Sequence, residues 1–211
     1  MTLILGDDAY PKIGKREYMQ RFEPFFGSKK MTLLRAAYAL SKVGHQSQKR
    51  EDGRRYFDHV RACSWIAVDE LHLYDPKLHN TLLLHDIVED TYLLTVETID
   101  VIFKTKTAVM VNLLTHREDI STAQYVENLR RSARARVIGA KLIDRLHNLR
   151  TLEACSPEKR LRKIDETREF YLPLSEHLMQ HISPKYAWRA QYLDAKLREL
   201  VDYWSTTTTA S

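Results

Sequence analysis

The stretch "LLLHDIVEDT", residues 82–91, places four ionisable side chains inside an apolar run. Its leucines, isoleucine and valine are typical of a helix that packs in a protein core. The ionisable members of the run are His85, Asp86, Glu89 and Asp90. Burial of an unpaired charge is costly unless the group is neutralised or binds a metal. The run therefore predicts a buried helix with a chemical role, in preference to a capped helix with a surface ion pair.

Helical spacing decides which of these side chains face the same way. On a continuous helix, residues four apart share a face, so we expect His85 to lie over Glu89. The same spacing places Asp86 over Asp90. His85 and Asp86 are adjacent and lie about 100° apart around the axis, which lets both reach one point at the edge of a cleft. Pro76, which precedes the run, suits the first turn of this helix.

The remaining sequence predicts helices almost throughout. Glycine and proline number six each among 211 residues, so interruptions are few. Residues 31–45 space apolar side chains on one helical face, and residues 46–56 form a polar segment that is typical of a loop. Cap signatures at Ser121 or Thr122, and at Ser156, mark two further helix starts. The prediction is an all-α, single-domain helical bundle.

Length and composition limit the organisation further. The predicted bounds are 1–28 for an N-terminal extension, 29–204 for the helical domain and 205–211 for a disordered tail. No apolar run approaches the roughly 18 residues of a membrane span, and the first residues lack the basic segment of a signal peptide. Cys63 and Cys155 lie far apart in the sequence, so we expect no disulfide framework and a location in the reducing cytoplasm.

The charge balance is basic, with a net charge of +5 and an isoelectric point near 9.1. Such a balance favours anionic partners, which include nucleotides, nucleic acid and phosphate groups. Basic residues cluster in 130–141, where the alternative interpretation is a solvated helix face. Composition alone leaves these partner classes open.

A second group of polar residues lies in "KLIDRLHNLRT", residues 141–151. Asp144 and Asn148 are four apart and share a helical face, and His147 lies three residues after Asp144. His59 is a third candidate, just after the polar loop. Two histidines and two aspartates from three helices would make a mixed nitrogen and oxygen site. Such a site suits Mn, Fe, Co or Zn, and a larger share of oxygen ligands favours the harder ions.

Three segments together resemble a known family. They are "HQSQKREDGRRYFDHV" (45–60), "LLLHDIVEDT" (82–91) and "AKLIDRLHNLRTLEACSPEKR" (140–160). The chain is similar, over roughly residues 30 to 180, to the hydrolase domain of RelA/SpoT homologues within the HD-domain phosphohydrolases. The resemblance implies an HD-type helical bundle and Mn²⁺-dependent removal of the 3′-pyrophosphate from guanosine tetra- and pentaphosphate. About thirty residues follow position 180, too few for the family's synthetase domain, so the resemblance implies a small alarmone hydrolase.

The same resemblance implies roles for individual residues. The implied metal ligands are His59, His85, Asp86 and Asp144. The implied catalytic carboxylates are Glu89 and Asp90, and the sequence leaves open which of them is the general base. The implied substrate-binding residues are Arg50, Asn148 and Thr151. Lys141 is a further candidate for neutralising phosphate, with a solvent-exposed lysine as the alternative, and His147 is a candidate to lie behind the ligands.

The sequence departs from the family pattern in the loop and after the central motif. Glu51 and Asp52 stand where the family usually has lysine and serine, in the loop expected near the purine. Carboxylates accept hydrogen bonds only, and adenine offers its N6 amino group where guanine offers an acceptor. The loop therefore predicts that adenosine 3′-pyrophosphates are accepted as well, although both acids could instead point to solvent or pair with neighbouring arginines. Lys104 replaces the usual glycine after Phe103, and we expect an effect on one turn only.

Two other classes of function remain as alternatives. Another HD-domain nucleotide phosphohydrolase, such as a 5′-nucleotidase, would share the metal site but release phosphate. A basic nucleic-acid-binding protein would bind DNA or RNA with strong salt dependence. The acidic residues of the predicted site disfavour that last class because they would repel a phosphate backbone. We expect a nucleotide alarmone as substrate and neither a membrane nor a nucleic acid as partner, and the oligomeric state stays open.

Overall fold

The computed structural model describes residues 3–209 and contains helices but no strand within that range. This confirms the all-α prediction. The chain forms two compact units. We call Tyr10–Arg117 the amino unit, and we call the described residues before Tyr10 together with those from Glu118 onward the carboxyl unit. The predicted bounds of the helical domain stay a prediction, and residues 1–2 of the predicted extension and 210–211 of the predicted tail lie outside the described residues.

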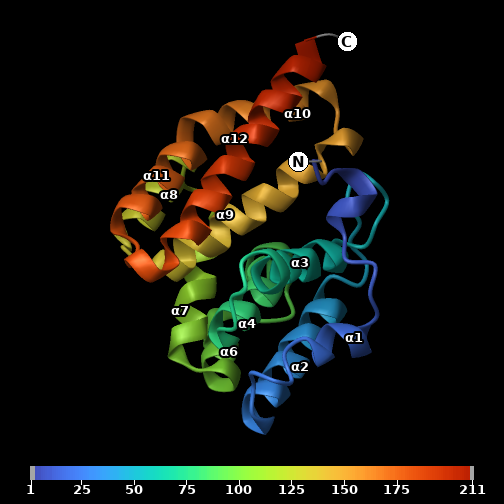
Figure 1. Ribbon diagram of the computed structural model, residues 1–211. Coiled ribbons are helices and arrows are strands. Elements are labelled where there is room, and N and C mark those ends of the chain that lie inside the picture. Colours follow the sequence, from blue (N-terminus) through green and yellow to red (C-terminus); the bar gives the residue numbers. More distant parts are fainter. Residues whose placement is uncertain (1–2, 210–211) are drawn as a thin grey trace. The chain divides into compact units, whose positions relative to one another are not determined.

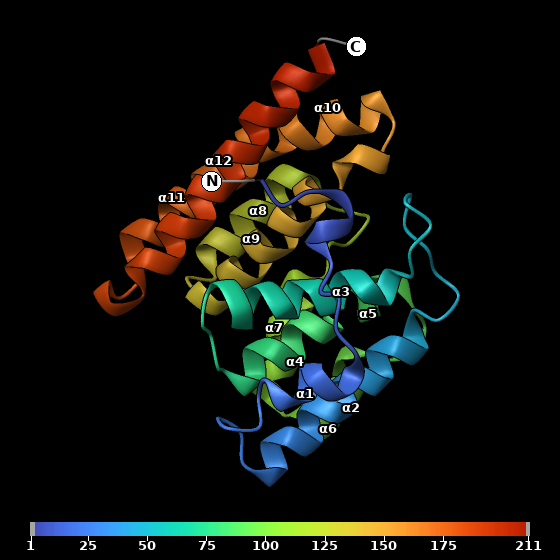
Figure 2. The same cartoon turned by 45° about the vertical axis from the view of Figure 1, so that its right-hand side comes forward.

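The amino unit is built around α4, which contacts α2, α3 and α7 (Figure 1). Figure 2 shows α3, which carries His59, and α4, which ends one residue before His85. The helical elements of the unit are α1 (Lys15–Gln20), α2 (Ser28–Gly44), α3 (Tyr56–Trp65), the π-helical turn η2 (Ile66–Glu70), α4 (Pro76–Leu84), α5 (Ile87–Asp90), α6 (Val96–Phe103) and α7 (Thr105–Leu114).

The core of the amino unit confirms the predicted face of α2. Leu34, Ala37 and Tyr38 are all buried there, against aromatic residues of the α1 region such as Phe22. Full burial of one large apolar side chain contributes about 1.5–3 kcal/mol. Residues 18–26, which the sequence suggested as part of an extension, therefore belong to the core of this unit. Residues 46–55 of the polar segment are irregular, as predicted, apart from one isolated bridge, and its last residue, Tyr56, begins α3.

A chain of buried hydrogen bonds ties α1 to α3 and α4. The Tyr18 hydroxyl lies 2.6 Å from Ser64 Oγ, which lies 2.9 Å from His79 Nδ1. His79 Nε2 lies 2.7 Å from the carbonyl oxygen of Leu73 and so must be the protonated nitrogen. Burial lowers the pKa of His79 to about 4, so the ring is neutral at pH 7 and each polar atom of the chain has a partner.

The central motif lies on two helices, so the prediction of one continuous helix through it is wrong. Asp75 caps the start of α4, where Pro76 takes the first position as predicted. The helix ends at Leu84, and α5 begins at Ile87. His85 Nδ1 lies 2.9 Å from the carbonyl oxygen of Leu82. In a continuous helix this carbonyl would accept the backbone N–H of Asp86, four residues further along. This side-chain bond competes with the helical ladder and turns the chain at the two ligand candidates.

The carboxyl unit packs its longest helix, α12, against α9, α10 and α11 (Figure 1). The Trp204 indole N–H of α12 donates to the carbonyl of Leu149 in α9 at 2.8 Å. The helical elements of the unit are the 3₁₀ turn η1 (Gly6–Ala9), α8 (Thr122–Arg131), α9 (Ala135–Arg150), the 3₁₀ turn η3 (Leu152–Ala154), α10 (Pro157–Glu166), the π-helical turn η4 (Thr167–Tyr171), α11 (Leu172–His181), the 3₁₀ turn η5 (Pro184–Tyr186) and α12 (Ala187–Thr209).

The sequence predicted the caps of α8 and α10 but not the helical end of α12. Ser121 and Ser156 cap α8 and α10 with their hydroxyl oxygens, as predicted. The predicted tail is instead helical up to Thr209. Ser205 and Thr207 donate their hydroxyls to carbonyls one turn earlier in α12, which lets these short polar side chains stay within a helix.

A buried ion pair joins α9 to α10. Arg145 Nη1 and Nη2 each donate to Glu166 Oε2 at 3.2 Å. The guanidinium of Arg145 also lies 3.8 Å from the centre of the Tyr171 ring. This arrangement compensates the burial of the arginine that follows Asp144 in the sequence.

No helix of the described chain is long and apolar enough to cross a membrane.

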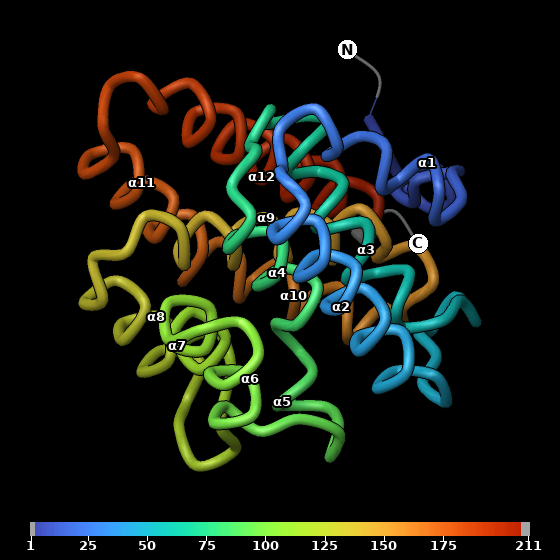
Figure 3. The backbone as a smooth tube through the Cα atoms, turned by 90° about the horizontal axis from the view of Figure 1, so that it is seen from below, coloured from blue at the N-terminus to red at the C-terminus, as the bar shows by residue number. Residues whose placement is uncertain are grey.

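Lys104 joins α6 to α7, which contact each other and lie together in Figure 3. Its backbone has φ 74° and ψ 158°. This region of backbone space is almost restricted to glycine, because a Cβ atom strains it. The substitution of lysine for glycine after Phe103 therefore affects one turn, as expected, and leaves that turn strained.

We expect Lys104→Gly to raise the free energy of unfolding by about 1 kcal/mol, because it removes this strain. Urea denaturation followed by far-UV circular dichroism measures the change. Lys106→Gly is the matched control, since Lys106 is an exposed lysine inside α7. That variant should lose about 0.5–1 kcal/mol. Equal losses in both variants would contradict the strain at Lys104.

Candidate functional site

Three predicted ligands converge in the amino unit. His59 lies on α3, and His85 and Asp86 lie at the turn between α4 and α5. The distance from Asp86 Oδ2 to His85 Nε2 is 3.1 Å, and that to His59 Nε2 is 3.7 Å. The two imidazole rings have centroids 5.6 Å apart. The structure thus brings together two buried imidazoles and one carboxylate.

A backbone hydrogen bond fixes the orientation of the His85 ring. Its Nδ1 donates to the carbonyl of Leu82, so Nε2 is the nitrogen that faces Asp86 and His59. A backbone bond of this kind sets the tautomer and aims the basic nitrogen of a metal-binding histidine. This donor set fits a divalent metal ion.

Tyr56 and His45 support the carboxylate of the site, although the sequence predicted no role for either of them. The Tyr56 hydroxyl donates to Asp86 Oδ2 at 2.8 Å. The His45 ring stacks on Tyr56 at a centroid distance of 4.8 Å, and its Nδ1 lies 2.6 Å from Gln48 Oε1. Gln48 in turn donates from Nε2 to the carbonyl of Asp90 at 2.6 Å. All three residues lie in the first quoted segment of the resemblance, which was the available signal.

Cys63 is a further residue that the sequence analysis did not place in the site. It lies on α3 one turn after His59, and its Sγ is 3.8 Å from His59 Nδ1 and 3.9 Å from Nε2. The potential ligand atoms of His59, Cys63 and His85 all lie within 4.8 Å of one another. The spacing of four residues from a histidine on one helix was the signal, but the cysteine was considered only as a possible disulfide partner.

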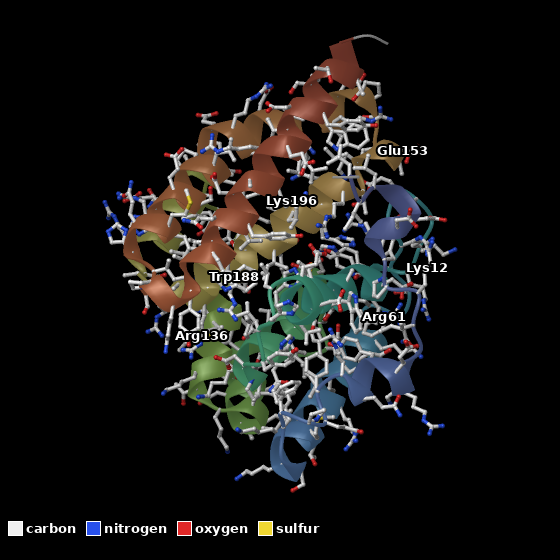
Figure 4. The ribbon with its side chains drawn as sticks, in the orientation of Figure 1. Lys12, Arg61, Arg136, Glu153, Trp188 and Lys196 are labelled. Carbon is white, nitrogen blue, oxygen red and sulfur yellow. The ribbon has the colours of Figure 1, made fainter. Side chains whose placement is uncertain are left out.

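The charge next to His59 is neutralised separately. Asp58 accepts hydrogen bonds from Arg55 at 3.0 and 3.1 Å, and Arg61 lies 3.4 Å away. Arg61, labelled in Figure 4, also donates to the carbonyl of Ile13 at 3.0 Å. These partners hold Asp58 in ion pairs with two arginines.

The two predicted catalytic carboxylates lie on α5 in different environments. Glu89 Oε2 accepts the backbone N–H of His116 at 2.7 Å. Burial raises the pKa of Asp90, and the charge of Asp86 raises it further. A carboxylate with a raised pKa is a stronger proton acceptor than an ordinary one.

The loop before α3 uses one of its two acids structurally. Asp52 accepts the Tyr10 hydroxyl at 2.7 Å and the backbone N–H of Arg54 at 2.9 Å. Glu51 is exposed. Arg50 accepts the backbone N–H of Gly53 and donates its own to Arg54, and its guanidinium lies 5.9 Å from the centre of the Tyr56 ring. The loop therefore places Arg50 beside the tyrosine that contacts Asp86.

The remaining predicted residues lie on or just after α9, in the carboxyl unit. Asp144 Oδ1 accepts the side-chain amide of Asn148 at 2.7 Å, and its Oδ2 pairs with Lys141 Nζ at 2.9 Å. Thr151 donates its hydroxyl to the carbonyls of His147 and Asn148. His147 is buried. Within this unit the structure brings together Lys141, Asp144 and Asn148, and the carboxylate of Asp144 contacts both the ammonium group of Lys141 and the side-chain amide of Asn148.

Comparison with known proteins identifies the family. The model of the HD domain family matches residues 37–179 of the chain. The chain belongs to the HD domain family. This HD domain is 35% identical over 208 residues to the GTP pyrophosphokinase rsh of Brucella melitensis, a match that covers 88% of the chain and 26% of that protein. It spans about a quarter of the length of the curated relatives it matches.

Two other relatives have names that specify hydrolysis. The HD domain is 36% identical over 155 residues to a probable guanosine-3′,5′-bis(diphosphate) 3′-pyrophosphohydrolase of Synechocystis, covering 69% of the chain and 20% of that protein. It is 33% identical over 172 residues to the bifunctional (p)ppGpp synthase/hydrolase SpoT of Escherichia coli, covering 77% of the chain and 24% of that protein.

A solved structure supports the fold. It is described as a metazoan ortholog of SpoT that hydrolyses ppGpp, and it superposes with a TM-score of 0.57 at 22% sequence identity. The match covers 85% of this chain and 97% of that chain. At this identity the likeness shows the fold of the HD domain and nothing further.

We expect Tyr56→Phe to weaken the binding of Co²⁺ to the metal-free protein by about 10–100-fold, because Asp86 loses the hydroxyl that orients it. Isothermal titration calorimetry measures the affinity, and circular dichroism should show an unchanged helical content. Tyr92→Phe is the control, since Tyr92 is fully exposed in the same unit. An affinity of Tyr56→Phe equal to that of the control would contradict the orienting role.

Proposed function

We propose that this HD domain hydrolyses the 3′-pyrophosphate of guanosine tetra- and pentaphosphate, releasing pyrophosphate with GDP or GTP. The main support is the coincidence of two findings. The two-histidine, one-carboxylate cluster of the amino unit lies in a chain that is similar to proteins named for this hydrolysis. The free, buried cysteines Cys63 and Cys155 fit the proposed location in a reducing cytoplasm.

We propose Mn²⁺ as the metal, held by His59, His85, Asp86 and Asp144. Imidazoles combined with carboxylates suit Mn and its neighbours, and the oxygen ligands favour the harder ions of that group. Asp144 enters the set because of its motif and because Asn148 fixes one of its oxygens. When bound, such an ion lowers the pKa of water and neutralises charge on phosphoryl oxygens.

The side chains around the ligands supply the other requirements of phosphoester hydrolysis. We assign Asp90 as the proton acceptor, on the basis of its raised pKa, and Glu89 to the placement of the attacking water. Lys141 and Arg50 carry positive charge to the phosphates. Asn148 and Thr151 are assigned to the sugar or 5′-phosphate side of the nucleotide. These roles follow the family pattern, and substitution of each residue tests its role.

The proposal predicts that the purified chain, incubated with ppGpp and Mn²⁺, releases pyrophosphate and GDP and that chelator abolishes the reaction. Ion-exchange chromatography separates these products. Release of orthophosphate would instead indicate another nucleotide phosphohydrolase, and salt-sensitive binding of RNA without turnover would indicate a nucleic-acid-binding protein. With adenosine 3′-pyrophosphates we expect a kcat/KM comparable to that with the guanosine ones, because the loop offers the carboxylates of Glu51 and Asp52 to the base.

The role of Asp90 predicts that Asp90→Asn keeps its bound metal and its KM but loses kcat by a factor of about 100 or more, as is typical of a general base. Glu89→Gln would show that loss instead if Glu89 were the base. Glu97→Gln is the control, because Glu97 is an exposed carboxylate of the same unit. Normal turnover in both the Asp90 and Glu89 variants, or loss of metal in both, would exclude these assignments.

A further inference from the structure

We propose that Cys63 is an additional donor to the metal site, and that it gives this HD domain a high affinity for thiophilic ions such as Zn²⁺ and Co²⁺. The inference rests on the metal site of the proposed function and adds a ligand to it. All the residues that carry it lie in the amino unit, so it depends on α3 and on the turn after α4.

The potential donor atoms lie close enough together to share one ion after small side-chain rotations. An ion about 2.05 Å from an imidazole nitrogen and about 2.3 Å from a thiolate holds the two donor atoms about 3.6 Å apart in tetrahedral geometry. The Sγ of Cys63 lies 3.8 Å from Nδ1 and 3.9 Å from Nε2 of His59, so the sulfur is equally close to both nitrogens. Rotation of these two side chains, without movement of the backbone, directs one nitrogen and the sulfur to a common ion. The corresponding separation for nitrogen and carboxylate oxygen is about 3.4 Å, and the two distances from Asp86 Oδ2 to the imidazoles, 3.1 and 3.7 Å, lie on either side of it.

The position of Cys63 on α3 keeps its sulfur close to the His59 ring. Residues four apart on α3 share a face, so Cys63 and His59 point the same way without any movement of the backbone. Both side chains are buried, with relative exposures of 0% and 1%. His85 reaches the same place from α4, with its ring held by the Leu82 carbonyl. The Sγ of Cys63 thus lies close to the imidazole nitrogens of both His59 and His85.

A thiolate changes the preference of the site among ions. Soft sulfur ligands favour Zn²⁺ and Co²⁺ over Mn²⁺ and Mg²⁺, which prefer oxygen. The thiol must lose its proton to bind, so each ion that binds to sulfur releases one proton to solvent as the sulfur–metal bond forms. The alternative is that Cys63 acts only as a small apolar side chain of the core, in which case valine would replace it without any effect on metal binding.

Cobalt absorption separates these two interpretations. Co²⁺ added to the metal-free full-length chain should give visible d–d bands together with a near-ultraviolet sulfur-to-cobalt charge-transfer band. In Cys63→Val we expect the charge-transfer band to vanish while weaker d–d bands from the histidines remain. Competition with Mn²⁺ should show that the preference for Zn²⁺ falls by about tenfold or more, a loss typical of even an outer-shell partner of a metal site. Cys155→Val is the matched control, because Cys155 is the other buried free cysteine and lies in the carboxyl unit, and it should keep both sets of bands.

The outcomes distinguish this inference from the proposed function. Visible d–d bands without a charge-transfer band in the wild type would overturn the role of Cys63 and leave the histidine and carboxylate site intact. Absence of all cobalt bands would overturn both. If Cys63→Val were to misfold, as judged by circular dichroism, Cys63→Ser provides the second variant. It should keep the fold and also lose the charge-transfer band, and retention of that band in a folded Cys63→Ser would contradict the proposal.

Discussion

Burial of the imidazoles of His59 and His85 among aliphatic side chains is the constraint on which the rest of the site depends. The neutral imidazole is the form that binds metals. The carboxylate of Asp86 lies between the two rings and cannot be left without compensation in such surroundings. The structure satisfies this requirement with the Tyr56 hydroxyl and with donors aimed at a common point. The apolar and ionisable residues of the central motif therefore serve one purpose, which is to hold charge-sensitive groups in a rigid and poorly hydrated place.

Much of the fold could be predicted because helical periodicity is a local property. The buried face of α2 and the caps at Ser121 and Ser156 follow from spacing and from side-chain chemistry. The break between α4 and α5 could not be predicted in this way. It arises where the His85 ring bonds to a backbone carbonyl of its own helix, and the periodicity of the apolar residues runs on through that point. The helical end of α12 was missed for a related reason, since hydroxyls that weaken a helix in general can also bond within it.

The candidate site was predictable in its strongest ligands and less so in its surroundings. His85 and Asp86 stood out because ionisable groups in apolar runs are uncommon, whereas His59 became a candidate only because the other ligand candidates accompany it. Tyr56 and Cys63 are ordinary core residues by composition, so only the three-dimensional structure shows that they lie against the ligands. The division into two compact units was also not visible in the sequence, because neither composition nor a linker marks it.

The residues before Tyr10 have a consequence for the order in which the chain can fold. The 3₁₀ turn η1 contacts α9 and η3, so it belongs to the carboxyl unit although it is the first described helical element of the chain. During synthesis on a ribosome, all residues of the amino unit emerge before α9 exists. Domains generally fold as units, with N-terminal ones first. The amino unit, with His59, His85 and Cys63, is therefore able to fold before the partners of η1 have been synthesised. The carboxyl unit is completed later, when η1 packs against α9 and η3.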